Sequence, residues 1–384
     1  MDGQRPCWAT IDLTALRANL ALAQELAGAR TTIAVVKADA YGHGAIDVAR
    51  GLLEAGCERL AVLSVDEAAE LREAAVGAPI LVLGGVHDER EAAHALSLHV
   101  TAVVHHVDGL RWLDAAARRA GTRARVHVEV DTGMRRMGVT PEEAPGLLAQ
   151  VDEEPALELE GVFSHFARAD ELDLAPSLEQ LRRFREVLAA AAERGVRPPM
   201  VHVDNSAGLL AGKVLGEALP EATAVRPGLM LYGVRPAAHL GEALRAVMTL
   251  YARVVHVHDV AIGQAVGYGA TWRAERPTRV ATLSVGYADG VARAQGGSGR
   301  VWIAGSPRSI VGRVSMDYIS VDVGSAPVRV GDTAIVFGGD VDEGIPVEEA
   351  ADAAGTVAYE LLVRVGGRVP RRLVEASPAG GNVA

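Results

Sequence analysis

The chain has 384 residues, of which 49% are hydrophobic and 23% charged, and its formal net charge is −11. This composition is close to the soluble globular average and excludes disordered and fibrous classes, while the acidic balance argues against a nucleic-acid or anionic-membrane partner. Only Cys7 and Cys57 occur, which excludes a disulfide framework and a cysteine zinc site. Because no apolar run suits a membrane span or a signal peptide, we expect a reduced, cytoplasmic protein without a metal centre.

Short apolar runs alternate with amphipathic stretches through residues 8–230, a length that predicts a large first domain. The runs are Thr32–Lys37, Arg59–Leu63, Pro79–Leu83, His99–Val103, Arg125–Val130, Leu157–Phe163, Met200–Val203 and Ala222–Val225. Helical spacing between them is clearest in Asp66–Ala75 and Pro176–Arg194. Strands that alternate with helices indicate a parallel sheet, and eight repeats favour a closed (β/α)8 barrel over a doubly wound sheet of five or six strands.

The pattern changes near residue 240, where short runs rich in Val, Ile and Thr are separated by Gly and Pro. The expected strands are Val247–Val260, Arg279–Val285, Arg300–Ile303, Arg308–Val314, Ile319–Val323 and Asp332–Phe337, and the expected helices are Val347–Ala354 and Tyr359–Val363. We therefore predict an α/β protein with a barrel domain, 1–238, and a mostly β domain, 239–384. An initial strand near residues 8–13 is expected to join the second domain, and the tail Ser377–Ala384 is expected to be disordered.

Lysine occurs only at Lys37 and Lys213, so all other basic residues are Arg. Lys37 ends an apolar run, and in a parallel barrel the catalytic groups lie at the carboxyl ends of the strands. Desolvation there lowers the pKa of an amine and favours the nucleophilic form that Schiff-base chemistry needs. Lys213 is expected at a solvated helix end. Lys37 is therefore the candidate reactive amine.

Other polar residues follow the later barrel strands and should lie on the same rim. They are Asp131 and Arg136 after the fifth, His165 after the sixth, Asn205 and Ser206 after the seventh, and Arg226, Gly228 and Leu229 after the eighth. The last two groups resemble a phosphate cup, although Asn-Ser before a helix is often only an N-cap. A lysine, an anion cup and a barrel together indicate pyridoxal 5′-phosphate (PLP).

Residues 34–44, with the sequence AVVKADAYGHG, closely resemble the alanine racemase family. Further blocks in the order of that family are Asp131–Met134, Ser164–Ala167, Asn205–Ala207, Arg226–Gly228, Gly267–Gly269, Gly286–Gly290 and Gly312–Asp317. Together they cover residues 8 to about 370. The resemblance implies a PLP-dependent racemase that acts on alanine, works as a homodimer with shared active sites and supplies D-alanine for peptidoglycan.

The resemblance also implies a role for each matching residue. Lys37 would hold PLP and act as the base on one face of the substrate Cα, and Tyr268 of the partner subunit would act on the other. The cofactor residues would be Lys37, Tyr41, His165, Asn205, Ser206, Arg226, Gly228, Leu229 and Tyr359, with His202 supporting Arg226. The substrate residues would be Arg136 and Met316, with Tyr287 and Asp317 near the entrance.

These roles agree with the chemistry of racemisation, which removes a proton from one face of Cα and returns it to the other. An amine and a phenol have ordinary pKa values near 10, so burial and neighbouring cations must lower them. Arg226 keeps its own proton and would leave the pyridine nitrogen of PLP unprotonated. That arrangement restrains electron withdrawal and favours simple proton exchange.

Three alternative functions share features with this sequence. A PLP decarboxylase of similar architecture would place an acid where Arg226 stands and would carry a Glu-Pro-Gly-Arg-like block that this chain lacks. A serine or broad-specificity racemase is disfavoured by crowding from Tyr268 and Tyr359, although one extra hydroxyl is rejected only weakly by size. A non-catalytic PLP-binding protein would consist of the barrel alone.

One position departs from the family. Two residues before Asp131, many alanine racemases carry a lysine that is carbamylated, whereas this chain has Glu129. Residues 129 and 131 share a face of a strand, and we expect that face to look toward Arg136. A carboxylate matches a carbamate in charge and in its two acceptor oxygens. Glu129 is therefore expected to supply permanently what the modified lysine supplies elsewhere.

Overall fold

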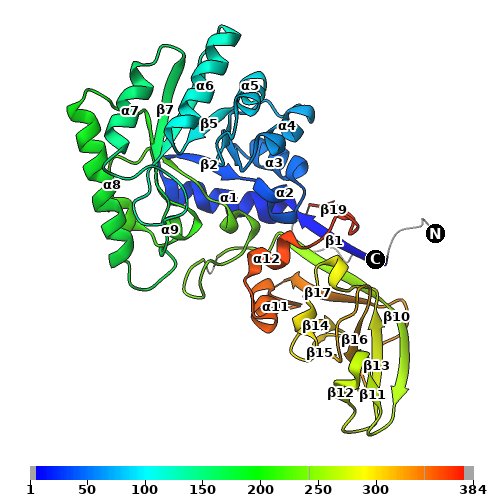
Figure 1. Ribbon diagram of the computed structural model, residues 1–384. Coiled ribbons are helices and arrows are strands. Elements are labelled where there is room, and N and C mark those ends of the chain that lie inside the picture. The colour runs from blue at the N-terminus through cyan, green and yellow to red at the C-terminus, as the bar shows by residue number, and fades with distance from the viewer. Residues whose placement is uncertain (1–5, 242, 341, 376–384) are drawn as a thin grey trace.

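The computed structural model describes residues 6–241, 243–340 and 342–375. The tail predicted to be disordered, Ser377–Ala384, lies outside these residues. Figure 1 shows a barrel wrapped by helices and a separate β domain beside it. Within the described part of the chain, no helix has the length and apolar character needed to cross a bilayer.

The barrel is closed by eight parallel strands, as the sequence predicted. In order they are β2 (Thr31–Val35), β3 (Arg59–Val62), β4 (Ile80–Val82), β5 (Thr101–Val104), β6 (Ala124–Glu129), β7 (Leu157–Phe163), β8 (Met200–His202) and β9 (Ala224–Val225). The surrounding helices are α1 (Leu13–Ala27), α2 (Lys37–Gly42), α3 (Ala45–Glu54), α4 (Val65–Glu73), α5 (Glu89–Ser97), α6 (Val107–Ala120), α7 (Ala144–Glu153), α8 (Ala175–Glu193), α9 (Ser206–Leu210) and α10 (Lys213–Ala218), followed by the short helix η1 (Leu229–Tyr232). β9 pairs with β2 and so completes the ring.

Side-chain alternation along the strands explains why the barrel has two apolar layers. Ile33 and Val35 point inward, where they pack with one residue or more from most of the other strands, including Phe163 on β7. Ala34 and Val36 point outward into the larger core beneath the helices. Because side chains of a strand alternate between its two faces, a near-continuous apolar run suits a strand that is buried on both.

The second domain is built on a nine-stranded sheet in the order β18-β17-β14-β15-β16-β13-β10-β1-β19. These strands are β1 (Cys7–Asp12), β10 (Met248–Val260), β13 (Thr278–Leu283), β14 (Arg300–Ile303), β15 (Ser306–Val311), β16 (Ile319–Asp322), β17 (Thr333–Gly339), β18 (Gly344–Ile345) and β19 (Arg371–Val374). The domain also holds the hairpin β11 (Ala265–Val266) and β12 (Trp272–Arg273), the short helices η2 (Tyr268–Ala270), η3 (Tyr287–Asp289) and η4 (Arg293–Gln295), and helices α11 (Val347–Ala354) and α12 (Ala358–Val363). The strands and helices predicted here are all present, but the short strands β11, β12, β18 and β19 were not predicted.

Both ends of the described chain meet in this sheet and tie it to the barrel. β1 pairs antiparallel with β10 and parallel with β19, so that Ala9 lies between Leu250 and Arg371. β1 leads directly into α1, whose first turn is capped by the Asp12 carboxylate through the amides of residues 14 and 15. α12 packs against α2, which brings the β domain to the barrel rim that carries Lys37.

Candidate active site

Lys37 stands where β2 ends and opens a turn with an uncommon backbone. The four residues from Ala38 to Tyr41 all have φ between 52° and 54° and positive ψ, so that they form one left-handed turn. For residues with a Cβ this conformation costs roughly 1–2 kcal/mol each. Nothing in the local sequence indicates this backbone, because none of the four residues is Gly. Surrounding contacts must therefore offset several kcal/mol of strain.

Contacts from three directions hold this left-handed turn. The Nδ1 of buried His43 lies 3.0 Å from the carbonyl oxygens of both Ala40 and Tyr41, to which it donates. Arg371 on β19 donates from Nε and Nη2 to the Gly42 carbonyl at 3.1 and 2.9 Å. Gly42 has φ +81° and a methyl group there would stand 2.3 Å from the Leu362 carbonyl oxygen, so α12 presses directly on the turn.

An anion cradle lies next to this turn, formed by residues that follow β8 and β9. Ser206 Oγ accepts hydrogen bonds from the amides of Gly228 and Met230 at 2.9 and 3.2 Å. Asn205 caps α9 by accepting from the Gly208 amide. A methyl group at Gly228 would stand 2.7 Å from the hydroxyl oxygen of Tyr41, so that only Gly leaves space here. The hydroxyl groups of Ser206 and Tyr41 and the amides of Gly228 and Met230 thus lie close together.

Arg226 is buried and fully engaged below the cradle. Its Nη2 donates to the Ser164 carbonyl at 2.8 Å, its Nη1 bonds His202 Nδ1, and its guanidinium carbon lies 4.6 Å from the centre of the Phe163 ring. Burial lowers the pKa of Arg226 to about 10. The guanidinium is therefore still cationic at neutral pH, and its plane is fixed from several sides.

A chain of polar groups continues from Arg226 through the barrel interior. His202 Nε2 lies 2.8 Å from His127 Nδ1, and His127 Nε2 lies 3.3 Å from the carboxylate of Glu160. Because a guanidinium only donates and a carboxylate only accepts, the protons of both imidazoles point toward Glu160. Burial would raise the pKa of Glu160, but bonds from His127, Thr101 and Arg59 hold it well below its ordinary value. His202 was predicted from the sequence, whereas His127 and Glu160 were not. Their only signal in the sequence is a polar side chain at an inward position of a barrel strand.

Burial and neighbouring charges shift the pKa values of the ionisable groups at the rim. Burial lowers the pKa of Lys37, the cations Arg136 and Arg226 lower it further, and Glu67 raises it. Burial and the same cations lower the pKa of His165 to about 3, so that its ring is neutral. His165 Nδ1 lies 3.3 Å from Arg226. Lys37, His165, Arg136 and Arg226 therefore share one electrostatic environment.

Glu129, at the end of β6, is buried rather than solvated, with 7% of its surface exposed. Its Oε2 lies 2.9 Å from Nδ1 of buried His105, whose Nε2 lies 3.0 Å from the Leu83 carbonyl oxygen. Arg136 is exposed, and among the described residues no ion pair joins it to Glu129. The structure thus gives Glu129 a partner, His105, that the sequence analysis did not name.

The structure brings one group of predicted residues to the barrel rim and leaves another on the β domain. Tyr359 on α12 reaches the rim, where its ring centre lies 6.3 Å from that of Tyr41. Tyr268 is 72% exposed, on η2 between β11 and β12, and Figure 1 shows this hairpin at the end of the β domain away from the barrel. Tyr287 and Met316 are also exposed. Asp317 pairs with Arg368, which also bonds Asp289 and so ties these loops together.

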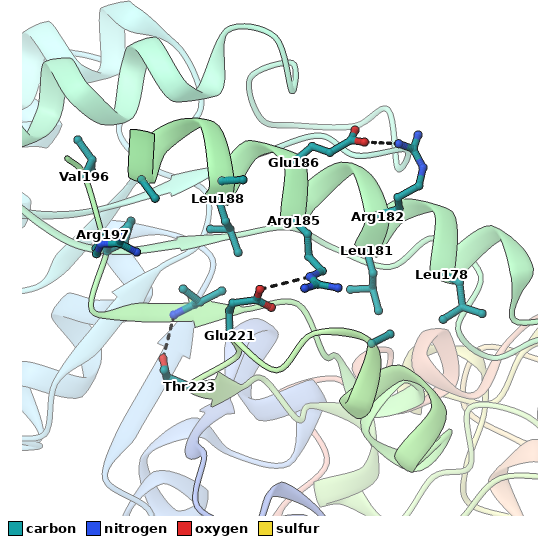
Figure 2. Close-up of a pocket in the computed structure, with 15 residues that line it drawn as sticks. Leu178, Leu181, Arg182, Arg185, Glu186, Leu188, Val196, Arg197, Glu221 and Thr223 are labelled. Carbon is teal, nitrogen blue, oxygen red and sulfur yellow. Dashed lines mark hydrogen bonds and ion pairs between the residues drawn. The ribbon is translucent and has the colours of Figure 1, made fainter. Parts of the chain in front are cut away.

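A groove elsewhere on the barrel is separate from this rim. Figure 2 shows it between α8 and the segments that precede β8 and β9, with Leu181, Leu188 and Val196 on its apolar side and Arg185 paired with Glu221. Its volume is about 710 Å³. These segments mark the amino ends of the strands, and in barrels that end contributes stability rather than chemistry.

The fold and site define a class: a parallel barrel that presents a lysine and an anion cradle at its carboxyl rim, joined to an antiparallel β domain. The families described as "Alanine racemase, N-terminal domain" and "Alanine racemase, C-terminal domain" match residues 11–236 and 247–373. Alanine racemase from Desulforamulus reducens is 42% identical, with 96% of this chain and 99% of the relative aligned. That from Syntrophobacter fumaroxidans is 42% identical over 94% of this chain and 95% of the relative.

Solved structures agree with these relatives. Alanine racemase from D-cycloserine-producing Streptomyces lavendulae superimposes with a TM-score of 0.92 at 37% identity, covering 98% of this chain and 99% of that one. The biosynthetic alanine racemase from Pseudomonas aeruginosa gives 0.85 at 38% identity, covering 97% and 100%. The chain belongs to the alanine racemase family. The resemblance, the enzyme class and the fold predicted from the sequence are therefore confirmed.

Proposed function

We propose that this chain interconverts L-alanine and D-alanine with PLP bound at the barrel rim. The observation that carries the proposal is the junction of Lys37, an amine whose pKa burial lowers, with the cradle of Ser206, Gly228 and the Tyr41 hydroxyl. The residues fit the cofactor, because the cradle offers hydroxyl and amide donors suited to a phosphate and a Cβ at Gly228 would fill it. PLP, when bound, supplies an electron sink that acidifies the substrate Cα–H.

The cofactor would be held by Lys37 through its amine and by several groups through its phosphate. The residues that would bind the phosphate are Tyr41, Asn205, Ser206, Gly228, Leu229 and Tyr359. Arg226 would donate to the pyridine nitrogen, and His202 fixes the guanidinium for that task. Because Arg226 keeps its proton at neutral pH, it would hold that nitrogen as an acceptor. His165, neutral and beside Arg226, would flank the ring.

Two groups on opposite faces of Cα would move the proton. Lys37 removes or returns it on one face, and Tyr268 of the partner subunit does so on the other. Tyr268 stands exposed on a hairpin remote from its own barrel rim, which is understandable if it completes the site of a second copy. We therefore propose a homodimer with shared active sites. Arg136 and Met316 would contact the substrate carboxylate, with Tyr287 and Asp317 near the entrance.

Mapping of the attached lysine tests the cofactor assignment. Borohydride treatment of the PLP-loaded protein should fix the cofactor to the peptide that contains Lys37. Lys213, exposed at the start of α10, is the internal control because it is the only other lysine. Labelling at Lys213, or none at either lysine, contradicts the proposal.

Subunit mixing tests the shared site. Lys37→Ala and Tyr268→Ala chains should each be inactive, and their mixture should regain activity because one of the two sites in each hybrid dimer is intact. A fully active monomer in sedimentation is the contrary result.

Turnover of alanine, serine and lysine by the purified protein decides substrate breadth, and we expect alanine to be preferred. Its D-alanine would be available in the cytoplasm for peptidoglycan synthesis.

A further inference from the structure

The carboxylate of Glu67, at the start of α4, contacts the backbone immediately after Lys37. Its Oε1 accepts a hydrogen bond from the Ala38 amide at 2.7 Å. Its Oε2 accepts from the amides of Leu63 and Ser64 at 2.6 and 3.3 Å. Glu67 is therefore bonded through both oxygens, and it joins the ends of β2 and β3 at the barrel rim.

Only part of this arrangement is needed to begin the helix. Ser64 and Glu67 form a capping box, in which Ser64 Oγ accepts from the Glu67 amide at 3.2 Å while the Glu67 carboxylate returns to the Ser64 amide. The bond to Ala38 lies outside that motif and contributes nothing to the cap. Ala38 is the first residue of the strained left-handed turn, and its amide donates to the Glu67 carboxylate.

The charge of Glu67 also acts on Lys37 itself. Burial, Arg136 and Arg226 all lower the pKa of the amine, and Glu67 is the group that opposes them. Arg136 comes from the segment after β6 and Arg226 from the segment after β9, so Glu67 balances the two cations from a third direction. The same carboxylate thus bonds the main chain at residue 38, and its charge acts on the side chain at residue 37.

We propose that Glu67 is a positioning residue, which fixes the backbone that carries Lys37 and thereby aims its amine at the proton it moves. This inference rests on the proposed role of Lys37 as one of two bases. An amide in place of the carboxylate cannot reproduce the arrangement, because all three partners are donors and one end of an amide is a donor as well. An aspartate keeps the charge but is one methylene too short to reach Ala38 and the cap together.

Four variants separate the effect of Glu67 on the position of Lys37 from the effects of its charge and of the helix cap. Glu67→Gln removes the charge and one acceptor, and Glu67→Asp keeps the charge but loses the reach. Ser64→Ala is the matched control for the cap, because it breaks the capping box without touching Ala38. Asp66→Asn is the matched control for charge in the same first turn of α4.

Hydrogen–deuterium exchange of the PLP-loaded protein gives a readout that does not depend on turnover. A hydrogen bond to a charged group contributes about 1.5–3 kcal/mol, so the Ala38 amide should exchange at least about tenfold faster in both Glu67 variants. In Ser64→Ala and Asp66→Asn it should remain as protected as in the original chain. Equal protection in all five proteins, or loss of protection in Ser64→Ala as well, overturns the proposal.

Isotope effects then show whether the position of the Lys37 amine relative to the proton has changed. Because the equilibrium constant between enantiomers is 1, kcat/KM must fall equally for L- and D-alanine. The Cα-deuterium isotope effect should rise only for the enantiomer whose proton Lys37 removes, since the step at Tyr268 is untouched. No change in either isotope effect, an equal rise for both enantiomers, or a normal Glu67→Asp variant overturns the proposal. Activity retained by Lys37→Arg would instead refute the proposed role of Lys37, and the exchange result would still stand on its own.

Discussion

Acidification should destabilise the fold through His43, the buried imidazole beneath the left-handed turn. Its Nδ1 donates to the carbonyls of Ala40 and Tyr41, and its Nε2 has no hydrogen-bond partner among the described residues. A second proton would therefore be buried without an acceptor. Burial lowers the pKa of His43 from 6.5 to about 4, although the two carbonyl bonds raise it slightly. The folded chain thus keeps this ring neutral at a pH where the unfolded chain has already protonated it.

The sign and size of the effect follow from this difference in proton uptake. Between pH 6.5 and 4 the unfolded state binds one more proton than the folded state, so the contribution of His43 to stability is lost as the pH falls through this window. Each unit of pH in that window corresponds to about 1.4 kcal/mol. From pH 7 to pH 5 the loss assigned to His43 is therefore about 2 kcal/mol.

Urea unfolding of the original chain and of His43→Gln at pH 7 and pH 5 measures this contribution. The variant loses a hydrogen bond at both pH values, but it has no proton to take up, so its deficit relative to the original chain should shrink by about 2 kcal/mol at pH 5. His94→Gln is the matched control, because His94 is exposed on α5 and its ring meets solvent in both states. A deficit that is the same at the two pH values, or an equal pH effect in His94→Gln, would refute the reasoning.

Three further predictions concern the site and its support. Gly228→Ala should weaken PLP binding at least tenfold, because the new methyl group fills the cradle. Titration of the cofactor into the apoprotein checks this, and an unchanged affinity contradicts it. Glu129→Gln should raise KM for alanine, because it weakens the contact with His105 and removes a buried negative charge that acts on Arg226. Steady-state kinetics measure this, and unchanged kinetics would remove Glu129 from the site. Arg371→Met should cost about 1.5–3 kcal/mol of unfolding free energy, since it removes charged hydrogen bonds to the Gly42 carbonyl, and an unchanged urea midpoint would show that the turn holds without it.

Local patterns predicted the architecture because burial imposes a period on the sequence. β7 was predicted at its observed residues, Leu157–Phe163, and the other barrel strands differ only by a few residues at their ends. In most of these runs both faces are largely apolar, since one faces the barrel interior and the other the helices. The rim residues followed from the same logic, because the carboxyl ends of parallel strands meet at one edge.

Other features depend on residues far apart in sequence, and no local pattern announces them. The backbone of Ala38–Tyr41 gives no sign of being left-handed. Apart from those of His43, the contacts that offset its strain come from distant residues such as Glu67 and Arg371, which is 329 residues from Gly42. No strand was predicted at β19, whose apolar content is low, and it forms a strand by pairing with β1.

The sequence by itself determined the family, the barrel-plus-sheet fold and most residues of the rim, because strand periodicity and short motifs are local properties. The tertiary structure decided how those residues are supported. It pairs Glu129 with His105, and it connects Arg226 to Glu160 through a chain of contacts that includes His202 and His127. Such partners are set by which inward positions of neighbouring strands face each other. That register exists only once the barrel has closed.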